Sequence, residues 1–479
     1  MQANRKDHIF FTGVSVFLLP FIVVFALTGQ WVYLLLPFVF FLFYIGWQSF
    51  SFVYFLLIAS IPWSTEIYFG DSMAMDFPDE LLMLLASALF IATLFYLKGN
   101  SKLIDWRHPL LWLAGLHFAW IILTASFSTN FIISLKYTLA KGWYIIAFLL
   151  FPLLFIQNKI QIKRIALLFS ISLFVITLVI LAKHAMDDFL FMRINNAVTP
   201  FFRNHVNYSA MLVCSLPLWF AMYRLNNDNG ILKKWIIVVI IIILGALIFA
   251  FSRGAWLAII TGAIAYILIR YKILWQTFVA GILLTTAFIF WLKSEDRYLG
   301  FAHDFKTTIF HTDFKEHLAA TYQLKDVSTA ERFNRWIAAV RMVPESPLVG
   351  VGPGTFTNNY KSFSIPAFKT WVSDNEEKST VHNYFLLLIT EQGWPGLFFF
   401  LLLLTAVFYY AQYFFHRLQD LFYKEMILAV ASIMVMIITL NFLSDLIETD
   451  KIGSLFFSCI AFLIIAGRQV KKEAVQVID

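Results

Sequence analysis

The stretch from Trp235 to Ile269 reads WIIVVIIIILGALIFAFSRGAWLAIITGAIAYILI, and it decides the class of this protein. Apolar residues fill it on both sides of a single polar break, Ser252-Arg253-Gly254. Each apolar half is long enough to form most of a membrane-spanning helix. The stretch therefore predicts two such helices with Arg253 at their junction. An ionised side chain in that position is costly and usually serves a function.

The composition of the whole chain supports the same class. Of its 479 residues 60% are hydrophobic and only 14% are charged, and the mean hydropathy is +0.77. These values exclude a soluble globular protein and predict an all-α polytopic membrane protein. The formal net charge of +7 does not indicate nucleic acid, because the basic residues stand in short loops between apolar runs. We expect a lipid bilayer around the chain and no nucleic-acid partner.

Cysteines and metal-ligating residues give no sign of a cofactor. Cys214 and Cys459 each lie inside an apolar run, as small buried hydrophobes do. No cluster with metal-ligand spacing occurs, so we expect neither a metal nor a cofactor. The first apolar run, Ile9 to Leu27, follows Arg5 and Lys6 and lacks a small-residue cleavage site, which predicts a retained helix.

Apolar runs separated by polar residues predict 12–14 transmembrane helices. The runs cover about 9–27, 31–47, 49–63, 80–97, 109–125, 138–156, 165–182, 206–223, 235–251, 255–269, 277–292, 395–415, 425–443 and 452–467.

One long connection divides the chain into three parts. We expect a transmembrane region of about eleven spans at 1–292, a loop or cap domain at 293–394, and a C-terminal region of about three spans with a short tail at 395–479. A connection of that size exceeds an ordinary linker and is large enough to fold over the membrane part. The chemistry is expected beneath it.

Basic residues recur on alternate connections, as the positive-inside rule requires. Both termini are therefore expected in the cytoplasm, and the long loop on the opposite side. The basic residues on the cytoplasmic side are Arg5, Lys6, Lys98, Lys102, Arg107, Lys159, Lys163, Arg164, Arg224, Lys233, Lys234, Arg270, Lys272, Arg417, Lys424, Arg468, Lys471 and Lys472.

Two polar segments break this charge pattern on the outer side. In the first, Arg203, His205 and Asn207 crowd a predicted helix start, and Asn204 is either a simple N-cap or part of an anion site. In the second, Arg253 follows Ser252. Its guanidinium either reaches lipid headgroups or presents a planar fork to two phosphate oxygens. The glycine after it would permit a close approach by a ligand or another backbone.

The long loop contains a helical segment and a glycine-rich turn. In the segment 331–340, helical spacing places Arg332, Arg335 and Trp336 on one face. This face is either a solvated surface with an internal Glu331–Arg335 pair or a contact for substrate. The turn at 347–356 offers backbone donors to a phosphate, although its proline removes one of them.

His382 and Asn383 open the next helical run. A histidine at a helix start is either a surface residue or a general base, whose neutral form the helix N-terminus favours. Glu391 lies nine residues further on, on the opposite face of a continuous helix at about 100° per residue. We therefore expect Glu391 to orient the loop, for example through an arginine, rather than to act with His382.

Four motifs in this order resemble the O-antigen ligase and polymerase superfamily. They are FRNHVNYSA at 202–210, FSRGAWLA at 251–258, PLVGVGPGTF at 347–356, and HNYFL at 382–386 with EQGWPG at 391–396. The resemblance covers about residues 200–400. It implies a multi-pass glycosyltransferase of the GT-C type in the bacterial inner membrane, with its active site at the periplasmic face.

Such enzymes pass a glycan from undecaprenyl pyrophosphate to lipid A core, to a growing polysaccharide or to a protein hydroxyl, without a metal. By this resemblance Arg203 and Arg253 hold the pyrophosphate and His382 is the base. We expect inversion in a single displacement, in lipopolysaccharide biosynthesis. The residues expected to contact substrate are His205, Asn207, Ser252, Arg332, Arg335, Asn383 and Glu391.

Other functions remain open at the level of sequence. A flippase for lipid-linked oligosaccharides also needs cations for pyrophosphate, but transporters usually place charges near the bilayer midplane. A receptor that uses the loop would not require arginines at two separate helix ends. Within the superfamily we favour ligation, because a single long loop late in the chain is the ligase-like arrangement.

Overall fold

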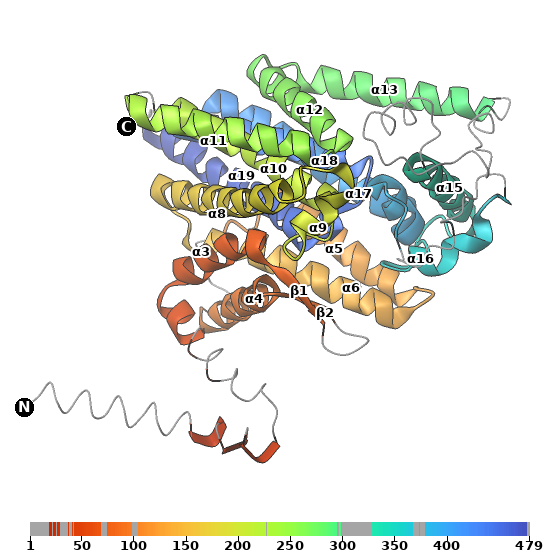
Figure 1. The fold of residues 1–479 in the computed structure, drawn as a ribbon, viewed down its shortest axis with the longest axis horizontal. Coiled ribbons are helices and arrows are strands. Elements are labelled where there is room, and N and C mark those ends of the chain that lie inside the picture. The colour runs from red at the N-terminus through yellow and green to blue at the C-terminus, as the bar shows by residue number, and fades with distance from the viewer. Residues whose placement is uncertain are drawn as a thin grey trace, which may run out of the picture.

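The structure, a computed structural model, describes residues 43–68, 74–97, 104–226, 228–294, 297, 327–366, 373 and 379–476, with isolated positions between 19 and 41. In these residues ten helices are long and apolar enough to cross a membrane, and they lie side by side in one bundle (Figure 1). The prediction of an all-α polytopic membrane protein is confirmed. The runs predicted at 9–27 and 31–47 fall mostly outside the described residues.

The long helices follow the predicted runs, except that the helices predicted at 138–156 and 395–415 start earlier, at Phe131 and Tyr384. They are α4 (Asp79–Tyr96), α5 (Pro109–Ser126), α6 (Phe131–Tyr144), α8 (Lys159–Ala185), α10 (His205–Leu225), α11 (Gly230–Phe249), α12 (Arg253–Arg270), α13 (Leu274–Lys293), α17 (Tyr384–Arg417), α18 (Leu421–Asn441) and α19 (Asp450–Gln476). A π-helical stretch, Ile145–Leu150, joins α6 to the short α7 (Pro152–Phe155). Shorter helices are α3 (Phe50–Ser60), α9 (Ile194–Val198), α15 (Val327–Met342) and α16 (Phe356–Asn359).

Asparagine side chains cap the N-termini of five of these helices. The side chains of Asn130, Asn158, Asn204, Asn229 and Asn383 each accept a hydrogen bond from a backbone N–H in the first turn of α6, α8, α10, α11 and α17. Such a cap satisfies donors that have no partner within the helix. Asn204 thus has the simpler of its two interpretations, that of an N-cap.

Helices α18 and α19 form the centre of the bundle. In α19, 94% of the most apolar window is buried, whereas in α11 only 22% is buried, so α11 lies at the periphery. Phenylalanines fill much of the interior, and Phe148, Phe151, Phe400 and Phe456 are all fully buried. Cys214 and Cys459 are buried and free, as predicted.

Several helix ends meet around the connection between α18 and α19. The backbone N–H of Tyr384, at the start of α17, donates to the carbonyl of Ser444 at 3.1 Å. The Lys451 ammonium, at the start of α19, lies 4.9 Å from the ring centre of Phe202, just before α10. Helices α10, α12, α17 and α19 therefore begin where α18 ends, and we call this the His382 end of the bundle.

Helix α12 contributes Gly254 to this end. A Cβ atom at Gly254 would stand 3.6 Å from Leu443 and 3.7 Å from Leu440, which is ordinary contact. The glycine therefore does not mark a close approach of another backbone in the described part of the chain, and the approach of a ligand stays a prediction.

A small hairpin at the His382 end has no counterpart in the sequence prediction. Strands β1 (Thr65–Tyr68) and β2 (Ala74–Phe77) pair antiparallel, with Glu66 opposite Asp76. The sequence marks this segment only as an acidic connection between two apolar runs.

Candidate functional site

His382 stands immediately before α17, in a loop with an unusual backbone. Its φ of +53° lies in the left-handed region, which a residue with a Cβ rarely adopts. The next residue, Asn383, caps α17 through its Oδ1 and donates from Nδ2 to the carbonyl of Phe442 at 3.2 Å. Both ends of this amide are engaged in holding the loop. Backbone strain of this kind is often found at functional sites.

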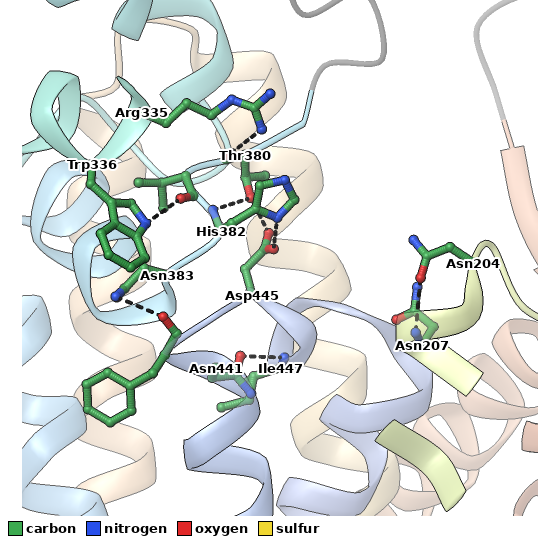
Figure 2. Close-up of polar contacts among 12 residues, drawn as sticks. Asn204, Asn207, Arg335, Trp336, Thr380, His382, Asn383, Asn441, Asp445 and Ile447 are labelled. Atoms are coloured by element: carbon green, nitrogen blue, oxygen red, sulfur yellow. Dashed lines mark hydrogen bonds and ion pairs between the residues drawn. The ribbon is translucent and has the colours of Figure 1, made fainter. Parts of the chain in front are cut away.

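A carboxylate that sequence reasoning missed faces His382. The Nδ1 atom of His382 lies 4.0 Å from Oδ1 of Asp445, and Figure 2 shows the two side chains directed toward one another. The Thr380 hydroxyl donates to the other oxygen of Asp445 at 2.5 Å and accepts from the backbone N–H of His382 at 3.5 Å. Asp445 therefore lies beside Nδ1 of the imidazole, at a distance longer than a hydrogen bond.

Helix α15 fixes the other side of the His382 loop. Arg335 donates to the carbonyl of Thr380 at 3.2 Å, and the Trp336 indole donates to the carbonyl of Val381 at 3.0 Å (Figure 2). Arg335 also pairs with Glu331 at 3.3 Å. The expected internal pair is thus present, but the face is not solvated, because both side chains are buried and contact Ser373 and Thr380.

Burial and the nearby charges favour the neutral imidazole of His382. Burial first, and then the guanidinium groups of Arg332 and Arg335, together lower the pKa of His382 from 6.5 to about 3. Burial also raises the pKa of Asp445, against the opposing effect of the Thr380 hydrogen bond. A neutral imidazole next to an acceptor on its Nδ1 side is the form that acts as a general base through Nε2.

Arg253 is the first residue of α12 and lies at the same end of the bundle. The preceding Phe251 has a φ of +52°, so this turn also carries a left-handed residue with a side chain. Ser252 is buried, and its side chain does not cap the helix. The turn adjoins Leu440 and Leu443 at the end of α18, next to Phe442, to which Asn383 is bound. Arg253 and the His382 loop therefore flank one connection.

The predicted segment around Arg203 lies apart from His382 and Asp445. Arg203 pairs with Glu66 of the hairpin at 3.0 Å, and His205 binds the side chain of Asn195 at 2.9 Å. Asn207 is buried in the first turn of α10, and its Oδ1 has no hydrogen-bond partner in the described part of the chain. Figure 2 shows Asn204 and Asn207 well separated from His382 and Asp445.

Acidic residues dominate the surroundings of Arg203. Burial, followed by the charge of Asp450, raises the pKa of Asp76 to about 6. In the described residues no group of three histidine, cysteine or carboxylate side chains is placed to hold a metal. The described partner of the Arg203 guanidinium is therefore Glu66, and a role of Arg203 toward an anion stays a prediction.

Glu391 orients the glycine-rich turn, but not through an arginine. Its two carboxylate oxygens accept from the backbone N–H groups of Gly354 at 2.8 Å and Phe356 at 2.9 Å. Its backbone carbonyl accepts from Gly352 at 3.0 Å. These donors are thereby occupied, so the turn does not offer them to a phosphate.

The same turn is held against neighbouring helices by close packing. A Cβ at Gly352 would stand 2.1 Å from the Ser128 hydroxyl oxygen, and one at Gly393 would stand 2.2 Å from the Leu348 carbonyl. Gly393 has a φ of +69° and breaks α17 just after Glu391. The glycines therefore serve packing and chain reversal.

We expect Glu391→Ala to lower the free energy of unfolding by about 2 kcal/mol or more, because two backbone donors lose their acceptor. Glu391→Gln keeps one acceptor oxygen and should cost less. Thermal unfolding in detergent, compared with the exposed carboxylate variant Glu345→Gln, measures the difference. Equal melting temperatures for Glu391→Ala and Glu345→Gln would contradict this role.

Comparison with known proteins bears on the central part of the chain. Residues 238–401 match the family described as O-antigen ligase. No curated protein matches the chain. The matched region extends from α11 into α17 and includes Arg253, Arg335, His382 and Glu391. The similarity is to the O-antigen ligase family, and it covers this part of the bundle of membrane helices.

Proposed function

We propose that the chain transfers a glycan from undecaprenyl pyrophosphate to an acceptor hydroxyl at the periplasmic face of the bacterial inner membrane. The acceptor we favour is lipid A core, which makes the reaction an O-antigen ligation. The observation that carries the proposal is the position of His382, which is directed toward Asp445, lies near Arg335 and stands where several membrane helices begin.

The proposed reaction is one in-line displacement. Nε2 of His382 takes the proton of the acceptor hydroxyl while its oxygen attacks the anomeric carbon of the donor. The bond from that carbon to pyrophosphate breaks, and its electron pair leaves with the pyrophosphate. Guanidinium groups in a site shielded from water stabilise the developing charge, so the residues themselves supply the positive field. The anomeric configuration is inverted.

The position of the two arginines and of His382 favours an enzyme over a flippase. Arg253 begins α12, Arg203 precedes α10 and His382 precedes α17, all at the same end of the bundle. A carrier for pyrophosphate would need its cations near the middle of the helices, where the substrate passes.

Deletion in the native host tests the function and identifies the acceptor. If the chain is a ligase, its loss removes all long glycan from lipid A and leaves lipid-linked polymer to accumulate. A single repeat unit on lipid A would instead indicate a polymerase, and loss of glycan from a protein would indicate a protein O-oligosaccharyltransferase. Unchanged glycans on all three acceptors would contradict glycan transfer.

The charge around His382 leads to a prediction about pH. In Arg332→Met one of the cations that disfavour the imidazolium is lost, so the pKa of His382 should rise toward its usual value. Because only the neutral imidazole accepts a proton, activity should then fail at a higher pH on the acid side than it does in the wild type. Initial rates of transfer between about pH 4 and 8 measure the acid limb. The control is Arg341→Met, an exposed arginine of the same helix. Superimposable acid limbs would contradict the prediction.

A further inference from the structure

Glu448 lies at the centre of a second polar cluster beneath the His382 loop. It ends the short 3₁₀ helix η8 (Leu446–Glu448) between α18 and α19. The Tyr137 hydroxyl donates to its Oε1 at 2.9 Å, and the Lys141 ammonium lies 3.1 Å from its Oε2. The Tyr384 hydroxyl is also hydrogen-bonded to it. Two hydroxyl groups and one ammonium group from two other helices thus converge on one carboxylate.

The Lys141–Glu448 ion pair is largely removed from water. The Lys141 side chain is 5% exposed and that of Glu448 is 18% exposed, and Lys141 belongs to a membrane-spanning segment, Phe131–Phe155. An ionised lysine at such a site requires a partner, and removal of one charge leaves the other unpaired in a poorly solvated place. The pair is therefore a strong geometric constraint on the connection that carries Glu448.

That connection also carries Asp445. The backbone N–H of Glu448 donates to the carbonyl of Asp445 at 3.0 Å, and the N–H of Ile447 donates to the Asn441 side chain at 3.1 Å. Tyr384, which reaches Glu448 with its hydroxyl, is the second residue after His382 and donates its N–H to Ser444. A single carboxylate thus links α6, the Asp445 connection and the segment that bears His382.

We propose that the Lys141–Glu448 pair positions Asp445 against Nδ1 of His382. Glu448 is a positioning residue in this arrangement and not a catalytic one, because its oxygens are engaged by Tyr137, Lys141 and Tyr384. The inference rests on the proposed glycan transfer, in which His382 is the base. In this proposal, helix α6 sets the orientation of the imidazole, because Lys141 of α6 holds Glu448 and Glu448 holds the connection that carries Asp445.

A double-mutant cycle tests the inference with purified protein, a lipid-pyrophosphate-linked glycan and an acceptor. Glu448→Gln should lower kcat by about tenfold with little change in KM, and Asp445→Asn should lower it further. The double variant should match Asp445→Asn alone, because Glu448 acts through Asp445. Lys141→Arg retains the charge and should retain most of the activity. Glu345→Gln, an exposed carboxylate, is the matched control.

A merely structural role gives a different result. In that case Glu448→Gln and Asp445→Asn would lower kcat independently, their losses would multiply, and the positioning role would be overturned while glycan transfer itself stood. Carbethoxylation of His382 by diethyl pyrocarbonate, followed by mass spectrometry, gives a readout without substrate. Glu448→Gln should change the rate of this labelling and Glu345→Gln should not. Equal labelling rates in Glu448→Gln and wild type would overturn the inference even if the chain transferred no glycan.

Discussion

His382→Ala is expected to lower the rate of glycan transfer by about 10²–10⁴-fold, the usual contribution of a positioned general base. Burial and two arginines hold the pKa of His382 at about 3, so its imidazole is neutral at neutral pH and keeps a nitrogen lone pair available for a proton. KM for the donor should change little, because the lost interaction develops during proton transfer. Transfer from a lipid-linked glycan by purified protein measures both constants.

The control for this prediction lies on the same helix. His416 stands near the opposite end of α17, where its Nε2 is 2.9 Å from the carbonyl of Ile269. His416→Gln preserves a donor and should leave transfer unchanged. The assignment of His382 fails if His382→Ala transfers glycan at the wild-type rate while the protein remains folded and abundant.

Arg253→Ala is expected to reduce transfer by about 10²–10³-fold, comparable to the loss of one donor to a developing anion. Arg253 begins α12 at the end of the bundle that also holds His382, and both the guanidinium and the helix N-terminus favour negative charge there. Arg253→Lys should restore only part of the rate, because an ammonium cannot contact two phosphate oxygens in one plane.

Arg270 offers the comparison for Arg253, since it is exposed at the far end of the same helix. Arg270→Ala removes an equal charge and should leave transfer near the wild-type rate. Equal losses in the two alanine variants would show that the effect comes from net charge or folding, and would contradict a role for Arg253 in holding pyrophosphate.

Local sequence signals predicted most of the described fold. The apolar runs at 206–223, 235–251 and 255–269 form α10, α11 and α12. Lipid offers no hydrogen-bond partners, and a helix pairs its backbone N–H and C=O groups within the segment. The run predicted from 395 is instead part of α17, which begins at Tyr384. The polar residues Glu391 and Gln392, followed by Gly393, separate its apolar first turns from that run in the sequence, although Asn383, a good cap, marked its start.

The candidate site was only partly accessible from sequence. Residues His382, Arg335 and Glu391 stood out because polar groups are rare beside apolar runs. Asp445 and Glu448 did not, since a carboxylate between two apolar runs is ordinary in a connection. Arg203 stood out as well, but the structure pairs it with Glu66 of a hairpin that no local pattern had indicated.

The sequence by itself determined the membrane class, the position of most helices and the residues whose charges needed explanation, because hydropathy and capping act over a few neighbouring residues. The tertiary structure alone decided which charges meet. It places Asp445 beside His382 and Lys141 beside Glu448. It also directs the backbone N–H groups of Gly354 and Phe356 to the Glu391 carboxylate. Buried polar groups need partners, and here the partners come from helices that are distant in the sequence. No local stretch of the chain determines how such helices pack against one another.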